Sequence, residues 1–313
     1  MKRVVIAGAT GFIGRQLCRQ LCEDYELIAL SRNTTKATEI LDGLAQVVQE
    51  GAKRVGDWAE TIDGAFAAIN LSGENIGSGR WTSGKKEKIL SSRLDSSKAL
   101  LEAIKRVREK PEVAVIASAI GFYGSRGDEQ IDEDSAAGKG FLADVCRQVE
   151  NIAKDIEAAG VRCVIIRSGV VLGRQGGALL KLMQPFRFSM GGHIGSGRQW
   201  FSWISLEDEA DAIRFLMEND NLHGAFNLTA PEPAKMKDFC NTLGKVLNRP
   251  SWFHVPDFIL KIIFGEMADE MLLASQKVYP KRLLQAGFRF KYPDLESAVK
   301  NILGQFARAN LSV

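Results

Sequence analysis

The segment Gly8-Ala9-Thr10-Gly11-Phe12-Ile13-Gly14 decides the fold of this chain. Residues 3–7 before it are apolar and rich in β-branched side chains, which predicts a short buried strand. After it, Leu17 and Leu21 follow Ile13 at helical spacing. A strand that turns through glycines into a helix begins a dinucleotide-binding βαβ unit, because glycines let the backbone approach a pyrophosphate and the helix N-terminus offers free N–H groups. We therefore predict a cofactor site with contacts at Gly8, Thr10, Gly11, Phe12, Ile13 and Gly14.

Further along the chain, predicted strands alternate with predicted helices. We expect strands at 26–30, 65–71, 113–119 and 161–171, and amphipathic helices at 94–107 and 141–156. This alternation is typical of an α/β fold with a Rossmann-like, doubly wound parallel sheet. From residue 231 onward the pattern becomes irregular, and that part holds six of the eight prolines. The sequence thus predicts a Rossmann domain over 1–230 and a smaller, substrate-side C-terminal domain over 231–313.

Composition argues against several classes of protein. The 41 basic and 38 acidic residues nearly cancel, which gives no support for binding to nucleic acid or to a membrane surface. The five cysteines form no C-x-x-C pair, and the three histidines show no ligand spacing, so we expect no metal. No apolar stretch approaches the length of a membrane span. We expect a cytoplasmic protein that acts on a small-molecule substrate, with no nucleic-acid or membrane partner; the sequence leaves the oligomeric state open.

The end of the second predicted strand indicates which cofactor binds. An acidic residue about twenty positions after the glycines would accept the ribose hydroxyls of NAD and repel a 2′-phosphate. This chain has Ser31 and Arg32 there instead. Arginine offers a permanently charged fork that suits a phosphate. We therefore predict NADP(H), the alternative being an ordinary surface arginine after a strand.

The glycine segment, with its G-x-x-G-x-x-G spacing, resembles the extended short-chain dehydrogenase/reductase superfamily, which includes nucleotide-sugar epimerases and dehydratases. We expect Leu71, Ser72 and Gly73, which end a later strand, to complete the cofactor site. The resemblance also implies a Tyr-x-x-x-Lys pair on one helix, where the lysine lowers the pKa of the tyrosine. None of the four tyrosines has a lysine four residues later. On the helix predicted from residue 141, Phe141 and Val145 stand where the pair is expected.

Three other residues are candidates for the missing chemistry. The resemblance implies that Ser118, at the end of an apolar strand, hydrogen-bonds the substrate hydroxyl, although a buried serine at a strand end also has a purely structural explanation. Tyr123 and Lys139 are possible substitute acid/base groups, the alternative for each being a plain loop residue.

Several more segments narrow the resemblance. Asn70–Glu74, Arg80–Thr82, Arg167–Gly173, Gly191–Gln199 and Ser275–Pro280 together are similar to an atypical subfamily of extended short-chain dehydrogenases called "epimerase family protein". In that subfamily the Tyr-x-x-x-Lys pair is typically absent. The resemblance implies that residues 174–204 form a loop region facing the substrate. Candidate substrate contacts within it are His193, Arg198, Gln199 and Trp200.

A near match to the ATP-binding P-loop covers residues 79–86, but it lacks the final hydroxyl that would hold magnesium. We interpret Thr82 or Ser83 as a helix cap instead. Two functional hypotheses remain. The first is an NADP(H)-binding oxidoreductase or nucleotide-sugar epimerase-like enzyme without the Tyr-x-x-x-Lys pair. The second is a catalytically weak cofactor-binding protein that serves as a redox sensor or scaffold.

Overall fold

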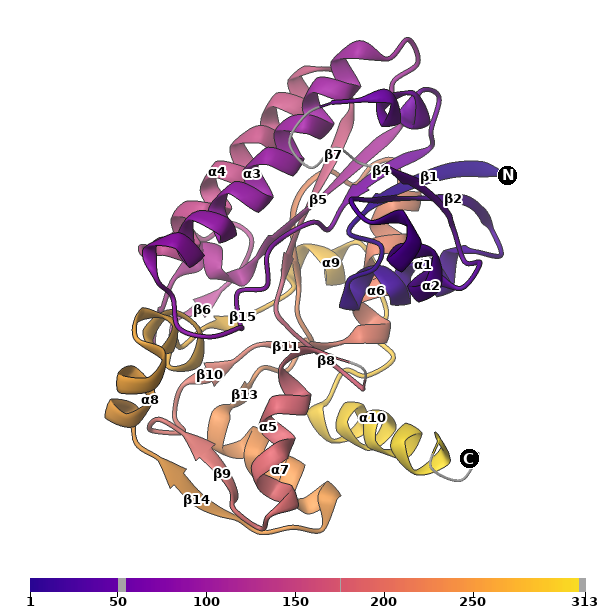
Figure 1. Cartoon of the computed structure of the whole chain (residues 1–313). Helices are drawn as coiled ribbons and strands as arrows, with labels where there is room; N and C mark the ends of the chain where they lie inside the picture. Colours follow the sequence, from indigo (N-terminus) through magenta and orange to yellow (C-terminus); the bar gives the residue numbers. More distant parts are fainter. Residues whose placement is uncertain (50–54, 175, 310–313) are drawn as a thin grey trace.

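A computed structural model of the chain describes residues 1–49, 55–174 and 176–309 (Figure 1). Residue 175 of the predicted substrate-facing region, and residues 310–313 of the predicted C-terminal domain, lie outside the described residues. Two lobes are visible: an upper one around a large sheet and a lower one of short strands and helices (Figure 1).

Seven parallel strands form the main sheet. Their spatial order is β12 (Gly224–Leu228), β7 (Arg162–Ser168), β5 (Val113–Ala119), β4 (Ala67–Asn70), β1 (Lys2–Ala7), β2 (Tyr25–Ser31) and β3 (Gln46–Gln49). From β1 the chain first winds outward through β2 and β3, and then continues on the other side through β4, β5 and β7. The predicted Rossmann-like, doubly wound fold is confirmed.

Helices cover both faces of this sheet because its strands are buried on both sides. On one face Val4 and Ile6 of β1 pack with α1 (Phe12–Leu21) and α6 (Leu206–Glu218). On the other face Val5 packs in a cluster to which three helices contribute: the 3₁₀ helix η1 (Asp57–Ile62), α3 (Ser83–Arg106) and α4 (Phe141–Ala158). Figure 1 shows α3 and α4 side by side on the left of the sheet, with α1, α2 (Thr34–Leu41) and α6 on the right.

The lower lobe is built from three separate stretches of chain, 170–205, 234–255 and 295–309. Its helices, which share one apolar core, are α5 (Gly177–Arg187), α7 (Met236–Leu247) and α10 (Leu295–Ala309). Its strand pairs are β8 (Val170–Gly173) with β11 (Trp203–Ser205), β9 (Gly191–Ile194) with β14 (Ser251–Val255), and β10 (Trp200–Phe201) with β13 (Ala234–Lys235). The region 174–204 is therefore mostly helix and strand rather than a loop. The boundary predicted at residue 230 does not by itself separate the lobes, since α5 and β9 precede it.

The remaining elements tie the lower lobe back to the upper one. They are η2 (Ile120–Tyr123), β6 (Gln130–Ile131), α8 (Asp257–Phe264), the π-helical turn η3 (Ala268–Leu272), β15 (Lys277–Val278) and α9 (Lys281–Gln285). Strand β15 pairs with β6, and Leu283 of α9 joins the core beneath the main sheet. This return brings residues 270–276 next to the carboxyl ends of the sheet strands.

Two local predictions can be judged here. Helix α3 begins at Ser83 rather than at residue 94, and the Thr82 hydroxyl accepts a hydrogen bond from the Lys85 N–H. Thr82 is thus the helix cap, as expected, and residues 79–86 are not a P-loop. In the part of the chain that the structure describes, no helix is both long and apolar enough to cross a bilayer.

Candidate functional site

The carboxyl ends of β1, β4, β5 and β7 open onto a cavity of about 580 Å³. Its floor is made by the turn from β1 into α1 and by the residues after β4, and its far end by Ser118, Ser168 and the cavity side of α4. The lower lobe closes the cavity with Gly177, Ala178, Glu270, Met271 and Gln276. The cavity is where ligands bind in doubly wound sheets, outside the carboxyl ends of the strands.

The glycine turn fits a pyrophosphate. Gly8 has a φ of +84°, and a Cβ on it would lie 2.8 Å from the backbone carbonyl group of Leu71. A Cβ on Gly14 would overlap the Gly8 carbonyl oxygen and lie 2.7 Å from the Ala9 Cα. Gly11 is different, since its Cβ would meet only the Gly8 oxygen, at 3.1 Å. Helix α1 begins at Phe12 without a side-chain cap, so its first N–H groups are available to an anion.

The Phe12 ring explains the glycines at the start of α5. A Cβ on Gly173, Gly176 or Gly177 would lie 2.7–2.9 Å from atoms of that ring. These glycines therefore let the lower lobe pack closely on the first turn of α1 rather than giving a mobile loop.

The predicted cofactor residues do not all lie in one place. Those that line the cavity are Gly8, Gly11, Phe12, Ile13, Gly14, Leu71, Ser72 and Gly73. Thr10, Ser31 and Arg32 are not among the described residues that line it. The Ser31 hydroxyl donates to the Asn33 carbonyl at 3.2 Å, and Arg32 is exposed.

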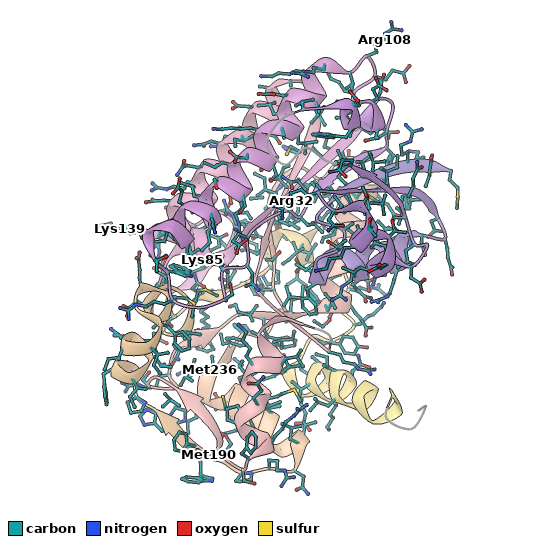
Figure 2. All side chains as sticks on the ribbon, in the orientation of Figure 1. Arg32, Lys85, Arg108, Lys139, Met190 and Met236 are labelled. Atoms are coloured by element: carbon teal, nitrogen blue, oxygen red, sulfur yellow. The ribbon has the colours of Figure 1, made fainter. Side chains whose placement is uncertain are left out.

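Ser31 and Arg32 nonetheless lie beside the glycine turn. In the parallel register of β1 and β2, Leu30 is opposite Ala7, which places both residues next to Gly8. Figure 2 shows Arg32 between α3 and the α1 side of the sheet. This position suits a contact with the adenosine end of a dinucleotide whose pyrophosphate lies on the glycine turn.

Ser118 lies at the end of β5 and lines the cavity. Its hydroxyl donates to Oε1 of Glu150 at 2.8 Å. Both oxygens of Glu150 also accept from Arg167, at 2.9 and 2.8 Å, and both side chains of this ion pair are 7% exposed. A buried carboxylate thus stands directly behind the serine.

Tyr123, a possible substitute acid/base group, is not among the described residues that line the cavity. Tyr123 is fully buried, and its hydroxyl donates to Asn227 at 2.7 Å and accepts from Arg167 at 2.8 Å. Burial raises the pKa of Tyr123 to about 12, although Arg167 opposes the shift. Tyr123 therefore orients Arg167. Lys139 is no substitute, because it is exposed at the outer edge of the molecule (Figure 2).

The cavity side of α4 differs from the expectation as well. Phe141 packs edge-on against Trp81, with ring centroids 5.4 Å apart, and does not point into the cavity. The α4 residues that line the cavity are Leu142, Val145, Cys146 and Val149. Burial raises the pKa of the Cys146 thiol, so it is neutral at physiological pH. Nothing on this side of α4 can take the place of a tyrosine–lysine pair.

The predicted substrate residues lie in the lower lobe, and the structure does not bring them to the cavity wall. Gln199 is buried, and its amide donates to the carbonyls of Ile194 and Leu272. His193 stacks on His254 with ring centroids 4.9 Å apart. Arg198 is exposed, and Trp200 donates to Asp128 at 2.6 Å.

Among the described residues, no cluster of three or more histidine, cysteine, aspartate or glutamate side chains is arranged to hold a metal ion.

Several residues in or behind the cavity wall were missed from the sequence. Glu150 and Arg167, which lie behind Ser118, had a readable signal, because each is a charged residue inside an element whose pattern predicts burial. Glu270 had none. Its carboxylate reaches α4 from η3 and accepts the N–H groups of Phe141 and Leu142 at 2.7 and 2.8 Å, which replaces a local helix cap. Arg93 and Gln276 were likewise not identified as site residues.

Comparison with known proteins agrees with this architecture. Residues 4–229 match the family described as "NAD dependent epimerase/dehydratase family". The chain belongs to this family. Residues 255–302 match a second family, a domain of unknown function called DUF1731. The resemblance to extended short-chain dehydrogenases called epimerase family proteins is confirmed.

Three relatives illustrate the family. "Epimerase family protein SDR39U1 homolog, chloroplastic" of Arabidopsis thaliana is 40% identical over 306 residues, covering 96% of this chain and 86% of the relative. "Epimerase family protein YfhF" of Bacillus subtilis is 38% identical over 302 residues, covering 96% and 97%. The crystal structure of human epimerase family protein SDR39U1 with NADPH superposes with a TM-score of 0.83 at 32% identity, covering 96% of this chain and 99% of the human one.

Proposed function

We propose that this member of the family is an NADP(H)-dependent oxidoreductase acting on a small molecule that carries a hydroxyl or carbonyl group. The observation that carries the proposal is the single cavity of about 580 Å³, which joins the glycine turn to Ser118. The human relative crystallised with NADPH supports the choice of cofactor. When bound, NADPH supplies a hydride from its nicotinamide ring to a carbonyl, and NADP⁺ accepts a hydride from an alcohol.

Ser118 and Glu150 take the part of the missing tyrosine–lysine pair. In the direction of alcohol oxidation, the Ser118 oxygen accepts the substrate hydroxyl proton while its own proton moves to Oε1 of Glu150, 2.8 Å away. In the direction of carbonyl reduction the same two protons move back. Both oxygens of Glu150 already accept hydrogen bonds from Arg167, so proton transfer to Oε1 has to disturb this pairing and the relay is slow.

The same pairing favours the second candidate function, a cofactor-binding sensor or scaffold with little turnover. Glu150 is held by Arg167, and the cavity side of α4 carries only apolar residues and a neutral thiol. Removing Ser118 separates the two: it lowers the turnover of an enzyme and leaves a sensor's NADPH binding unchanged.

The substrate class, a nucleotide sugar or another small molecule, is part of the proposal, as are a cytoplasmic location and the absence of nucleic-acid, membrane and metal partners. The name of the Arabidopsis relative places that protein in the chloroplast.

The test has two stages. Fluorescence titration with NADPH and NADH comes first, and a failure of NADPH to bind refutes the proposal. Turnover is then followed at the nicotinamide absorbance band with a panel of nucleotide sugars, sugars and hydroxy acids. On common nucleotide sugars we expect rates far below about 1 s⁻¹, since ordinary enzymes reach that value. With any substrate that is turned over, Ser118→Ala lowers the rate by about 100-fold or more and leaves NADPH affinity unchanged. A Ser118→Ala variant of full activity contradicts the assigned relay.

A further inference from the structure

Arg93 is a charged side chain in the cavity wall that the proposed relay does not use. It comes from α3 and lines the cavity beside Gly73. Its Nη1 donates to two backbone carbonyls, those of Glu74 at 3.0 Å and Ile89 at 3.2 Å. Among the described residues that line the cavity, it is the one cation.

The other edge of the Arg93 guanidinium is free. In the described part of the chain, neither Nε nor Nη2 has a hydrogen-bond partner, and no carboxylate lies within ion-pair distance. A Cβ on Gly73 would lie 2.9 Å from Cζ but 3.1 and 3.2 Å from Nη2 and Nε. An atom placed at the edge of the guanidinium would be closer to the nitrogens than to Cζ. Because Cζ is the nearest of the three atoms, Gly73 lies over the flat face of the guanidinium. The Nε–Nη2 edge, which binds carboxylates and phosphates through two parallel hydrogen bonds, stays open.

The two carboxylates in the cavity wall are engaged elsewhere. Glu74 pairs with Lys85 at 2.6 Å, and Lys85 holds the pKa of Glu74 below its usual value. Glu270 accepts the N–H groups at the start of α4. Burial lowers the pKa of Arg93, although the Glu74 carboxylate opposes the shift from beyond ion-pair distance. Such a group is stabilised when an anion binds next to it.

Arg93 lies at the reactive end of the cavity rather than at the adenosine end. Helix α3, which carries Arg93, packs on α4, and the Cys146 thiol of α4 donates to the carbonyl of Ala119, the neighbour of Ser118. Arg93, Cys146 and Ser118 all line the same cavity. We propose that Arg93 is an anion subsite and that the substrate carries a carboxylate or phosphate group close to the carbon that reacts beside Ser118. This proposal rests on the proposed function and names its substrate class.

Isothermal titration of the NADP⁺-saturated protein tests it, since the cofactor then fills the phosphate positions at the glycine turn. The probes are lactate, inorganic phosphate and lactamide, which has the shape of lactate without its charge. We expect at least one of the two anions to bind, and lactamide to bind about tenfold or more weakly than lactate if the subsite takes carboxylates. Binding of lactate alone assigns a carboxylate, and binding of phosphate alone assigns a phosphate. The proposal is wrong if neither lactate nor phosphate binds. It is also wrong if lactamide binds as tightly as lactate while phosphate does not bind.

Variants assign any anion binding to Arg93. Arg93→Gln is expected to weaken it at least tenfold, and Arg93→Lys by less, because lysine keeps the charge and loses the fork. Arg108→Gln is the matched control, an exposed arginine at the end of the molecule far from the lower lobe (Figure 2). NADPH affinity and melting temperature are measured for each variant. If Arg93→Gln weakens NADPH as much as the anion, Arg93 serves the cofactor and the inference fails. If the unaltered protein does not bind NADPH, the proposed function fails instead.

Discussion

The two ends of the cavity are built in different ways. At the cofactor end, five residues of the β1–α1 turn line the cavity, helix α1 begins there with N–H groups that have no side-chain cap, and the glycines matter for the side chains they lack. At the substrate end, the wall carries side chains from separate elements: Ser118 of β5 with Glu150 of α4 behind it, Arg93 of α3 and Glu270 of η3. Few substitutions are tolerated in the glycine turn, because there the backbone itself binds the cofactor. At the substrate end, by contrast, replacing one side chain can change the chemistry and leave the rest of the wall in place.

This difference explains how the chain keeps a cofactor site while lacking its superfamily's catalytic pair. The glycine turn depends on backbone geometry that α4 does not touch. Exchanging residues on the cavity side of α4 therefore alters proton transfer and leaves pyrophosphate binding intact. The following predictions test how separate the two ends are.

The largest effect is expected within the glycine turn. In Gly14→Val the new side chain overlaps the backbone of Gly8 and Ala9. We expect the unfolding free energy to fall by about 3 kcal/mol or more, and we expect cofactor binding to be lost as well. In Gly11→Val the fold is retained, because the Cβ meets only one oxygen at 3.1 Å, but the side chain enters the cavity and NADPH binding is lost.

Thermal unfolding and NADPH titration separate the two variants. Gly84→Val, where nothing lies within 4 Å of the added Cβ, is the control and changes neither quantity appreciably. A Gly11→Val protein that binds NADPH normally would place the pyrophosphate elsewhere.

At the substrate end, the buried ion pair behind Ser118 gives the next largest effect. Glu150→Leu leaves Arg167 buried without a counter-ion, which costs about 3–5 kcal/mol of unfolding free energy. The double variant Glu150→Leu with Arg167→Met recovers part of this loss. Urea unfolding measures both. If the single variant is as stable as the unaltered protein, the pair is not a buried ion pair in solution.

Ser168, also in the cavity wall, donates at 2.5 Å to Glu209, which has no exposed surface. Burial raises the pKa of Glu209 from 4.5 to about 8. The folded protein therefore holds this proton more tightly than the unfolded chain does. The contribution of Glu209 to the unfolding free energy is most favourable below pH about 4.5, and it declines as the pH rises toward about 8.

The contribution of Glu209 is a slope of about 1.4 kcal/mol per pH unit within that window. Glu209→Gln removes it, because the amide has no proton to lose. Urea unfolding of both proteins at several pH values between 5 and 8 measures the difference. Parallel curves would mean that Glu209 titrates normally.

The smallest effect is expected at Arg32, since its side chain is exposed and water competes for the phosphate. Arg32→Ala weakens NADPH about tenfold, the value of one charge-assisted hydrogen bond, and leaves NADH unchanged. Fluorescence titration of both cofactors measures it. An equal loss for NADPH and NADH would place Arg32 away from the 2′-phosphate.

The sequence predicted most of the upper lobe. The strands expected at 26–30 and 113–119 agree with β2 and β5, and the helix expected at 141–156 agrees with α4. Strands β3 and β12 were not predicted, and α3 begins eleven residues earlier than expected, at Ser83 rather than 94. The lower lobe was predicted poorly. The resemblance implied a loop over 174–204, whereas the structure has α5 and β9 there, and the contact of Gly173, Gly176 and Gly177 with the Phe12 ring is not visible in the local sequence.

What the sequence determined by itself is local: a glycine turn between a strand and a helix, an alternating pattern that makes a parallel sheet, and the absence of a Tyr-x-x-x-Lys pair. These depend on residues within a few positions of one another. Only the tertiary structure decided what faces the cavity. It buried Tyr123 against Arg167, placed Glu150 behind Ser118, and left one edge of Arg93 open. These contacts join residues that are 17 to 44 positions apart in the chain, and no periodic pattern in the sequence predicts them.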